Sequence, residues 1–188
     1  MNKFMQILNN FNDGNKVFLL VNFINFAIFI ILYFTTVYQP WLLSHYLFHD
    51  DSFYYFKIAE NINNINMISF SGLTETNGFH PLWLFFLALT LFFFSTLNIY
   101  LSGMQASLIL SVIIFSISLY YLKRSLNHIN FINPGIVFFL FQIFLWRFMF
   151  DGMESVLIIL LSVLIFYTTL LRYFSLALFF LGLFIFAR

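Results

Sequence analysis

Two adjacent aspartates open the most polar stretch of the chain. Asp50 and Asp51 lead a segment that runs to Ile62 and reads DDSFYYFKIAENI. Paired carboxylates can act as a general base on an attacking group, or hold a divalent cation that neutralises a phosphate. The plain alternative is a helix cap, in which a carboxylate accepts hydrogen bonds from free backbone N–H groups. The pair alone does not separate these roles.

The residues after this pair are spaced like a short helix over about 51–65. Tyr54 and Tyr55 follow one turn later, on the same face as the carboxylates. Lys57 and Asn61 continue the polar stripe along that helix. Apolar residues occupy the other side and can face lipid or protein, which is typical of a helix in the membrane interface.

A histidine stands immediately before a second expected helix. The sequence TNGFHPLW has a turn signal at Asn77-Gly78 and a proline, Pro81, suited to the first helical turn. His80 is then either an ordinary polar residue at the water boundary or a contact for a phosphate or a metal ion.

A second pair of acids lies much further along the chain. Asp151 and Glu154 are three residues apart and can share a face, and Gly152 interrupts the helical pattern between them. Arg147 precedes Asp151 by four residues, so a local ion pair is the plain explanation for both. Glu154 lies at the start of an apolar helix, where an ionisable group is costly and is therefore a functional candidate.

The composition requires these residues to be positioned by a membrane protein. Hydrophobic residues make up 62% of the chain and charged residues 8%, with a mean hydropathy of +0.95. A soluble domain is about half apolar and about a quarter charged, so this chain has too little polar surface for water. There is no cysteine for a disulfide or a thiolate site, and a net charge of +1 argues against a nucleic-acid partner.

The apolar runs predict an all-α, polytopic transmembrane bundle with an outer loop at 39–102. That loop contains two juxtamembrane helices, at about 51–65 and 81–99. A spanning helix needs about 20 apolar residues, and the expected spans are 17–38, 103–122, 132–150, 153–171 and 175–187. The first follows Lys3 and Lys16 and is expected to be an uncleaved signal anchor. The last stops at Arg188 within an apolar helix, so we expect a longer natural protein or a second chain that completes it.

The charges decide between two paths for residues 81–100. Basic residues beside spans favour the cytoplasm, so Lys3 and Lys16 place the N-terminus inside and the acidic segment 39–80 outside. If 81–100 lies in the interface or re-enters, both acidic pairs lie outside together. The basic or near-basic positions then placed in the cytoplasm are Lys123, Arg124, His128 and Arg172. If 81–100 spans instead, the basic positions lie outside and Asp151 and Glu154 lie inside. The segment is apolar enough to span, so this alternative stays open.

The order of these features resembles the GT-C glycosyltransferases, polytopic enzymes that take a sugar from a polyprenyl-phosphate carrier. Relatives include the protein O-mannosyltransferases, the aminoarabinose transferase acting on lipid A and the oligosaccharyltransferase catalytic subunit. The resemblance is carried by three stretches, 50–62, 76–83 and 152–155, and covers roughly the first 155 residues. It is strongest to bacterial members, which implies the plasma (inner) membrane of a bacterium, with the acidic site outside.

The resemblance implies a role for each matching residue. Asp51 would be the catalytic carboxylate, assisted by Asp50, and Glu154 would be the second acid. His80 would contact the carrier phosphate, where some branches have a lysine instead, so the fixed positive charge is in doubt. The residues implied to contact substrate besides His80 are Tyr54, Tyr55, Lys57 and Asn77. Asp51 and Glu154 are also the implied ligands for a divalent cation, Mg²⁺ or Mn²⁺.

The expected function is therefore transfer of a sugar from a polyprenyl-phosphate-linked donor to an acceptor at the outer membrane face. The expected partners are that donor and membrane lipid. Two alternatives stay open: a transporter or flippase for a lipid-linked substrate, and a non-catalytic fragment or partner subunit of such an enzyme. A transporter predicts charges deep in the spans or paired broken helices, whereas here only Arg147 is deep.

Overall fold

The computed structural model describes residues 14–131 and 134–187, and all regular secondary structure in these residues is helical. The all-α prediction is confirmed. The helices are α2 (Gly14–Tyr38), α3 (Pro40–Tyr46), α4 (Asp50–Ile65), α5 (Pro81–Thr96), α6 (Gly103–His128), α7 (Pro134–Met149), α8 (Ser155–Leu170) and α9 (Phe174–Ala187). Lys3, Arg188 and the predicted start of a span at Ile132 lie outside the described residues.

Two of the described helices are long and apolar enough to cross a membrane: Asn15–Tyr38, with 24 residues, and Gly103–His128, with 26. At about 1.5 Å per residue, 26 residues extend about 39 Å, which exceeds a hydrocarbon core of about 30 Å. Helices α5, α7 and α8 have 16 residues and α9 has 14. The predicted spans at 132–150, 153–171 and 175–187 thus form apolar helices that are shorter than a full perpendicular crossing.

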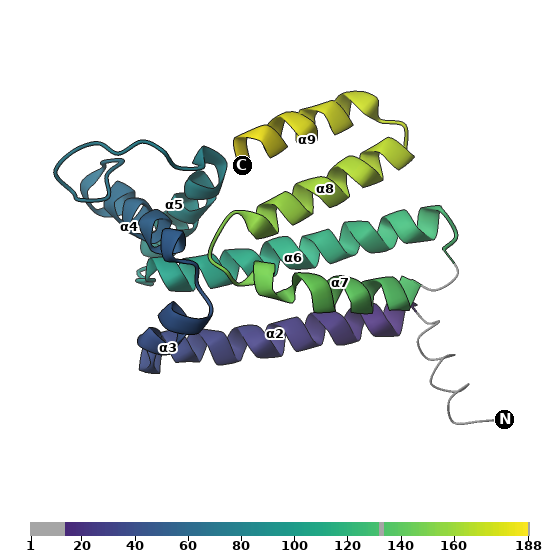
Figure 1. Ribbon diagram of the computed structural model, residues 1–188, viewed down its shortest axis with the longest axis horizontal. Coiled ribbons are helices and arrows are strands. Elements are labelled where there is room, and N and C mark those ends of the chain that lie inside the picture. Colours follow the sequence, from purple (N-terminus) through teal and green to yellow (C-terminus); the bar gives the residue numbers. More distant parts are fainter. Residues whose placement is uncertain (1–13, 132–133, 188) are drawn as a thin grey trace.

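The chain is arranged around α6, which packs against α2, α4, α5, α7 and α8. Figure 1 shows α3, α4 and α5 gathered at one end of α2 and α6, where α2 ends and α6 begins. Helices α7, α8 and α9 run alongside, and the turn between α7 and α8 lies at that same end. The helices predicted at about 51–65 and 81–99 correspond to α4 and α5.

The beginning of α6 is fixed to α4 by polar contacts and by close backbone approach. Ser102 and Gln105 form a capping box, in which each side chain accepts from the other residue's backbone N–H. The Gly103 N–H donates to Glu60 Oε1 at 2.8 Å. A Cβ on Gly103 would collide with the backbone and Cβ of Phe56. The long helix therefore starts at a defined point against α4.

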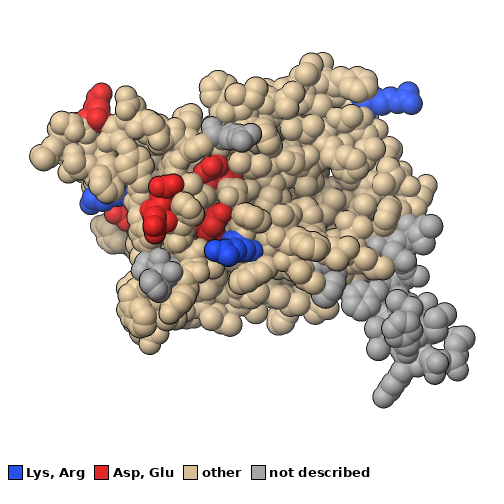
Figure 2. Space-filling model, in the orientation of Figure 1, with Lys and Arg blue, Asp and Glu red and all other residues tan. Residues whose placement is uncertain are grey.

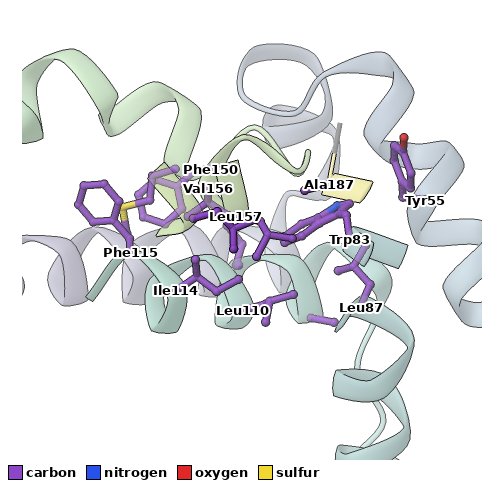
Figure 3. Close-up of a cluster of buried hydrophobic side chains, with 14 of the residues drawn as sticks. Tyr55, Trp83, Leu87, Leu110, Ile114, Phe115, Phe150, Val156, Leu157 and Ala187 are labelled. Atoms are coloured by element: carbon purple, nitrogen blue, oxygen red, sulfur yellow. The ribbon is translucent and has the colours of Figure 1, made fainter. Parts of the chain in front are cut away.

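One apolar core joins the two sets of helices. Trp83, Leu87, Phe115 and Val156 are completely buried. Figure 3 shows Trp83 and Leu87 of α5 beside a cluster of side chains from α6, α8 and the end of α9. Since burial of a large apolar side chain stabilises by roughly 1.5–3 kcal/mol, this cluster holds α5 against the bundle.

A polar pair lies inside the bundle between α2 and α7. Gln142 Nε2 donates to Asn25 Oδ1 at 2.6 Å, and Asn25 is completely buried. The other polar atoms of the two amides, Asn25 Nδ2 and Gln142 Oε1, are buried without a hydrogen-bond partner. Each such unpaired atom lowers stability by about 1–3 kcal/mol. This cost opposes the stabilisation that the hydrogen bond provides.

The charges are separated along the molecule. Within the described residues, all acids lie on α4, on the α4–α5 loop or on the α7–α8 turn. Figure 2 shows acidic side chains gathered over that end. The described Lys and Arg residues near the opposite end of the helices are Lys16, Lys123, Arg124 and Arg172. Lys57 and Arg147 are the described basic residues at the acidic end.

Candidate functional site

Helix α4 begins with a histidine cap rather than an aspartate cap. His49 is the N-cap residue: its Nδ1 accepts from the backbone N–H of Asp51 at 3.4 Å, and its carbonyl accepts from the Ser52 hydroxyl at 2.6 Å. The expectation that Asp50 or Asp51 caps this helix is wrong. Both stand in the first turn with exposed side chains, so their carboxylates point to solvent and can meet a ligand.

The turn between α7 and α8 is held by the carboxylate of Asp151. Its Oδ1 accepts from the Met153 N–H at 2.9 Å and its Oδ2 from the Ser155 hydroxyl at 2.7 Å. The Asp151 carbonyl accepts from the backbone N–H of His49 at 3.0 Å. The two acidic stretches, far apart in sequence, are therefore joined by a backbone hydrogen bond.

The predicted ion pair between Arg147 and Asp151 is absent between these two described residues. Arg147 is exposed, while the Asp151 carboxylate is occupied by its own turn. Burial raises the pKa of Asp151, and the hydrogen bonds from Ser155 and Met153 oppose that shift. Asp151 is thus a structural carboxylate, and Arg147 is left to interact with something else.

The two tyrosines of α4 hold the segment that ends in His80. Tyr55 Oη accepts from the His80 backbone N–H at 3.2 Å, and Tyr54 Oη donates to the Asn77 carbonyl at 3.4 Å. Asn77 was predicted as a substrate contact. Here its carbonyl takes part in positioning, and its side chain is exposed. Residues 77–80 are therefore fixed to α4 through tyrosine hydroxyls.

His80 and Glu154 form a pair beneath this segment. Nε2 of His80 lies 3.8 Å from Oε1 of Glu154, and the two side chains are 30% and 12% exposed. His80 Nδ1 and Glu154 Oε2 are buried without a hydrogen-bond partner. Glu154 directly precedes α8 but makes no capping bond with its side chain. A partly buried imidazole and a partly buried carboxylate thus each retain one buried polar atom without a partner.

Tyr55 lies close to these charges and is itself buried. Burial raises the pKa of Tyr55 to about 12. The negative charges of Glu154 and Asp51 contribute to this rise, whereas the hydrogen bond from the His80 N–H opposes it. Tyr55 therefore stays a neutral phenol at physiological pH, able to donate its proton to a ligand.

Tyr55 and His80, together with Asp50 and Asp51, line a hollow of about 490 Å³, here called the acidic hollow; Glu154 is not part of its lining. Its lining residues come from α4, the α4–α5 loop and the α7–α8 turn: Asp50, Asp51, Phe53, Tyr54, Tyr55, Phe70, Gly78, His80 and Met153. Asp50 also lines a second hollow of about 430 Å³, here called the arginine hollow. That hollow is lined by Tyr46, Leu47, Phe48, His49, Asp50, Arg147, Phe148 and Asp151.

The structure brings together most, but not all, of the residues predicted for the site. Lys57, Asn77 and Glu154 line neither hollow, although Glu154 lies next to His80. Two contributors were missed. Phe70 stacks on Tyr54 with ring centroids 5.1 Å apart and lines the acidic hollow. Trp83 donates from Nε1 to the Gly152 carbonyl at 3.0 Å. The sequence signal available for Phe70 was an aromatic residue in a polar loop. No local sequence feature indicated that Trp83 bonds to Gly152.

The expected divalent cation stays a prediction. Within residues 14–131 and 134–187 there is no group of three or more His, Cys, Asp or Glu side chains placed to hold a metal ion. The unpartnered Oε2 of Glu154 and Nδ1 of His80 are oxygen and nitrogen donors of the kind that a metal accepts. Asp51 is exposed at the same hollow, so an ion there would be completed by water or substrate oxygens.

Fold and site together define a coarse class: a strongly apolar chain whose described residues form helices, two of them long and apolar enough to cross a membrane, with an acidic hollow at one end. The chain matches no protein-family model, no curated protein and no solved structure. Any narrower assignment must therefore rest on the chemistry of the hollow.

Proposed function

We propose that this chain forms the reaction site of a GT-C-like membrane glycosyltransferase that uses a polyprenyl-phosphate-linked sugar. The observation that carries the proposal is the convergence of three distant segments, 49–55, 77–80 and 151–155, on one hollow. These segments overlap the stretches that resemble the GT-C enzymes. The hollow combines the exposed carboxylates of Asp50 and Asp51 with the His80 imidazole, which pairs with Glu154 outside the lining. This set suits proton removal beside a departing phosphate.

Asp51 is the proposed general base. Its carboxylate removes the proton from the acceptor hydroxyl as that oxygen forms a bond to the anomeric carbon. The bond between that carbon and the phosphate oxygen breaks, and its electron pair leaves with the polyprenyl phosphate. Asp51 has an exposed carboxylate on the wall of the hollow, as this role requires. Asp50 adds negative charge beside it, and the Glu154–His80 pair orients the donor sugar or a cation.

Arg147 of the arginine hollow is a candidate for the fixed positive charge that the resemblance does not place at His80. His80 has no fixed positive charge where some GT-C enzymes have a lysine. Arg147 lines a hollow that shares Asp50 with the acidic hollow, and it is a permanent cation suited to a phosphate. We place the departing phosphate between His80 and Arg147, with the lipid tail along the apolar surface of α7.

The path of the chain supports the proposed topology. Helix α5 starts at the site, ends at Thr96 and is followed by α6 only seven residues later, at Gly103. Both α4 and α5 pack on α6 at the end where it begins. Because α5 and α6 both begin at this end of the bundle, α5 is then an interfacial or re-entrant helix, and both acidic stretches lie on one face of the membrane. We place this face outside and the N-terminus in the cytoplasm of a multi-pass protein.

The decisive experiment replaces the proposed base in the full natural chain. Membranes containing Asp51→Asn are assayed for transfer of labelled sugar from polyprenyl-phosphate mannose and polyprenyl-phosphate aminoarabinose. We expect the rate to fall by about 10²–10⁴-fold, the usual contribution of a general base. The matched control is Glu75→Gln, which neutralises an exposed acid of the same outer loop and should leave the rate unchanged.

Three outcomes separate the proposal from its rivals. Unchanged transfer by Asp51→Asn overturns the assignment of the base. Movement of the lipid-linked sugar across vesicles without any transfer favours a flippase. Absence of transfer by the unaltered chain, with activity only after a second chain is added, favours a partner subunit.

A further inference from the structure

A third hollow lies at the opposite end of the molecule from the proposed reaction site. It measures about 340 Å³ and lies between the last turns of α6 and the end of α8, lined by Arg124, Asn127, His128, Tyr167 and Leu171. None of these side chains is acidic, and every acid within the described part of the chain lies near the other end. We call it the basic hollow.

Three of the side chains that line the basic hollow are exposed hydrogen-bond donors. Arg124, Asn127 and His128 are all exposed. Arg124 has its guanidinium carbon 5.7 Å from the ring centroid of Tyr120, a cation–π arrangement that limits its freedom. A planar guanidinium with an amide and an imidazole beside it is a donor set suited to the oxygens of a phosphate.

The partial negative charge at the C-terminal ends of α6 and α8 does not by itself explain this group of donor side chains. The carbonyl ends of α6 and α8 carry partial negative charge, which favours one nearby cation. Several of these carbonyls are already satisfied, since Ser125 O accepts from Ile129 N and Tyr167 O from Leu171 N. Arg172 follows Leu171 directly and adds a further exposed cation beside the hollow. The positive charge therefore exceeds what the helix ends require.

The position of the hollow indicates the source of the phosphate. It is open at the end of α6, which among the described helices is one of two long enough to cross a bilayer. In a membrane crossed by α6, this end would lie at the depth of the lipid headgroups. Exposed apolar side chains adjoin it, including Ile129 and Phe166. Basic hollows between helices at the cytoplasmic face are suited to anionic lipid headgroups.

We propose that the basic hollow binds the phosphate of an anionic phospholipid headgroup, with Arg124 as its main contact. Asn127 and His128 donate to the remaining phosphate oxygens, and the acyl chains lie along the apolar sides of α6 and α8. This site does not depend on sugar transfer at the other end. It depends on the end of α6 lying at the membrane surface.

The test measures lipid binding by the purified full chain in detergent. Phosphatidylglycerol, phosphatidylcholine and inorganic phosphate are titrated separately, and the midpoint of thermal unfolding is recorded. We expect phosphatidylglycerol to raise the midpoint most. Arg124→Gln should weaken its apparent affinity by about fivefold, since a basic residue at an anionic surface contributes about 1 kcal/mol. Asn127→Asp, which adds a negative charge, should weaken it further.

Lys57→Gln is the matched control, because it removes an exposed cation at the opposite end that lines neither of the hollows there, and it should preserve the phosphatidylglycerol effect. Equal stabilisation by phosphatidylcholine would overturn the charge requirement. Equal stabilisation by inorganic phosphate at the same concentration would overturn the lipid source. An unchanged response in both Arg124→Gln and Asn127→Asp would overturn the location.

Discussion

The indole Nε1 of Trp83 donates a hydrogen bond of 3.0 Å to the carbonyl of Gly152, although 69 residues separate them. Trp83 lies in the first turn of α5, three residues after His80, and Gly152 lies in the turn that leads to Glu154. The bond therefore connects the two backbone segments that carry the buried pair. A hydrogen bond in the core, made by a residue that does not touch substrate, therefore helps to position the His80 imidazole and the Glu154 carboxylate.

Replacement of Trp83 by phenylalanine tests this connection. Trp83→Phe keeps an apolar ring but leaves the buried Gly152 carbonyl without its donor, which should lower the free energy of unfolding by about 1–3 kcal/mol. The thermal unfolding midpoint in detergent is the measurement. Trp146→Phe, at a residue that is 47% exposed, should change the midpoint little. Equal effects of the two substitutions would contradict the role given to the bond.

Gly152 should not tolerate a side chain. Its φ is +78°, and a Cβ would lie 2.7 Å from atoms of Phe48 and Phe56 and 2.8 Å from Ser52. Gly152→Ala should destabilise by about 1–3 kcal/mol through overpacking and backbone strain. Gly182→Ala is the control, because a Cβ there meets nothing within 4 Å, and an alanine in a helix should add about 0.5–1 kcal/mol. Opposite signs of the two changes are expected.

The tyrosine hydroxyls should differ in importance. Tyr55→Phe removes the acceptor of the His80 N–H, a part-buried bond of 3.2 Å, and should lower both stability and sugar transfer. Tyr54→Phe removes an exposed bond of 3.4 Å to Asn77 and should change stability by under about 0.5 kcal/mol. Unfolding midpoints and transfer rates of both variants make the comparison. A larger loss of stability in Tyr54→Phe would contradict this order.

Acid should stabilise the protein through Asp151. Burial raises its folded pKa above the unfolded value near 3.8, so the folded state binds the proton more tightly. Stability therefore falls as pH rises from 3.8 through the folded pKa, and rises again on acidification. Asp151→Asn can still accept from the Met153 N–H through Oδ1 and can donate from Nδ2 to the Ser155 hydroxyl, but it cannot titrate. Its stability relative to the unaltered chain should be greatest at pH 7 and smaller below it; a difference independent of pH would contradict the linkage.

Surface labelling distinguishes the two paths of α5. The chain has no cysteine, so Leu73→Cys and Asn130→Cys each introduce a single thiol at an exposed position. If α5 does not span, a membrane-impermeant maleimide added outside intact cells labels position 73 alone, and position 130 reacts only after lysis. Labelling of both positions from outside would mean that α5 crosses the membrane.

Apolar runs and turn residues predicted the helices well, because both signals are local. The predicted helices at about 51–65 and 81–99 formed as Asp50–Ile65 and Pro81–Thr96. The second ends earlier because Asn98 adopts a left-handed conformation, with φ of 58°. The span predicted over 103–122 continues as a helix to His128, since hydropathy reports the membrane limit while polar residues extend the helix beyond it. The short helix α3 at Pro40–Tyr46 had no such signal.

The membership of the site was only partly predictable. The acids and His80 were conspicuous as rare polar groups in an apolar chain, and the structure places Asp50, Asp51 and His80 around one hollow. The atoms that position them were hidden, because hydrogen bonds such as Trp83 to Gly152 join residues distant in sequence. Local spacing also gave Arg147 the wrong partner, since Asp151 is occupied within its own turn.

The amide pair between Asn25 and Gln142 fixes the register of two helices that are otherwise almost entirely apolar. Apolar surfaces in lipid can slide past one another at little cost, but a slip by one turn, about 5.4 Å, would break this bond and leave four buried amide atoms unpaired. Helix α7 therefore has one preferred depth beside α2. The depth of α7 in the bundle determines how close Arg147 lies to the site. The uncharged contact between Asn25 and Gln142 thus sets the position of a charged side chain at the surface.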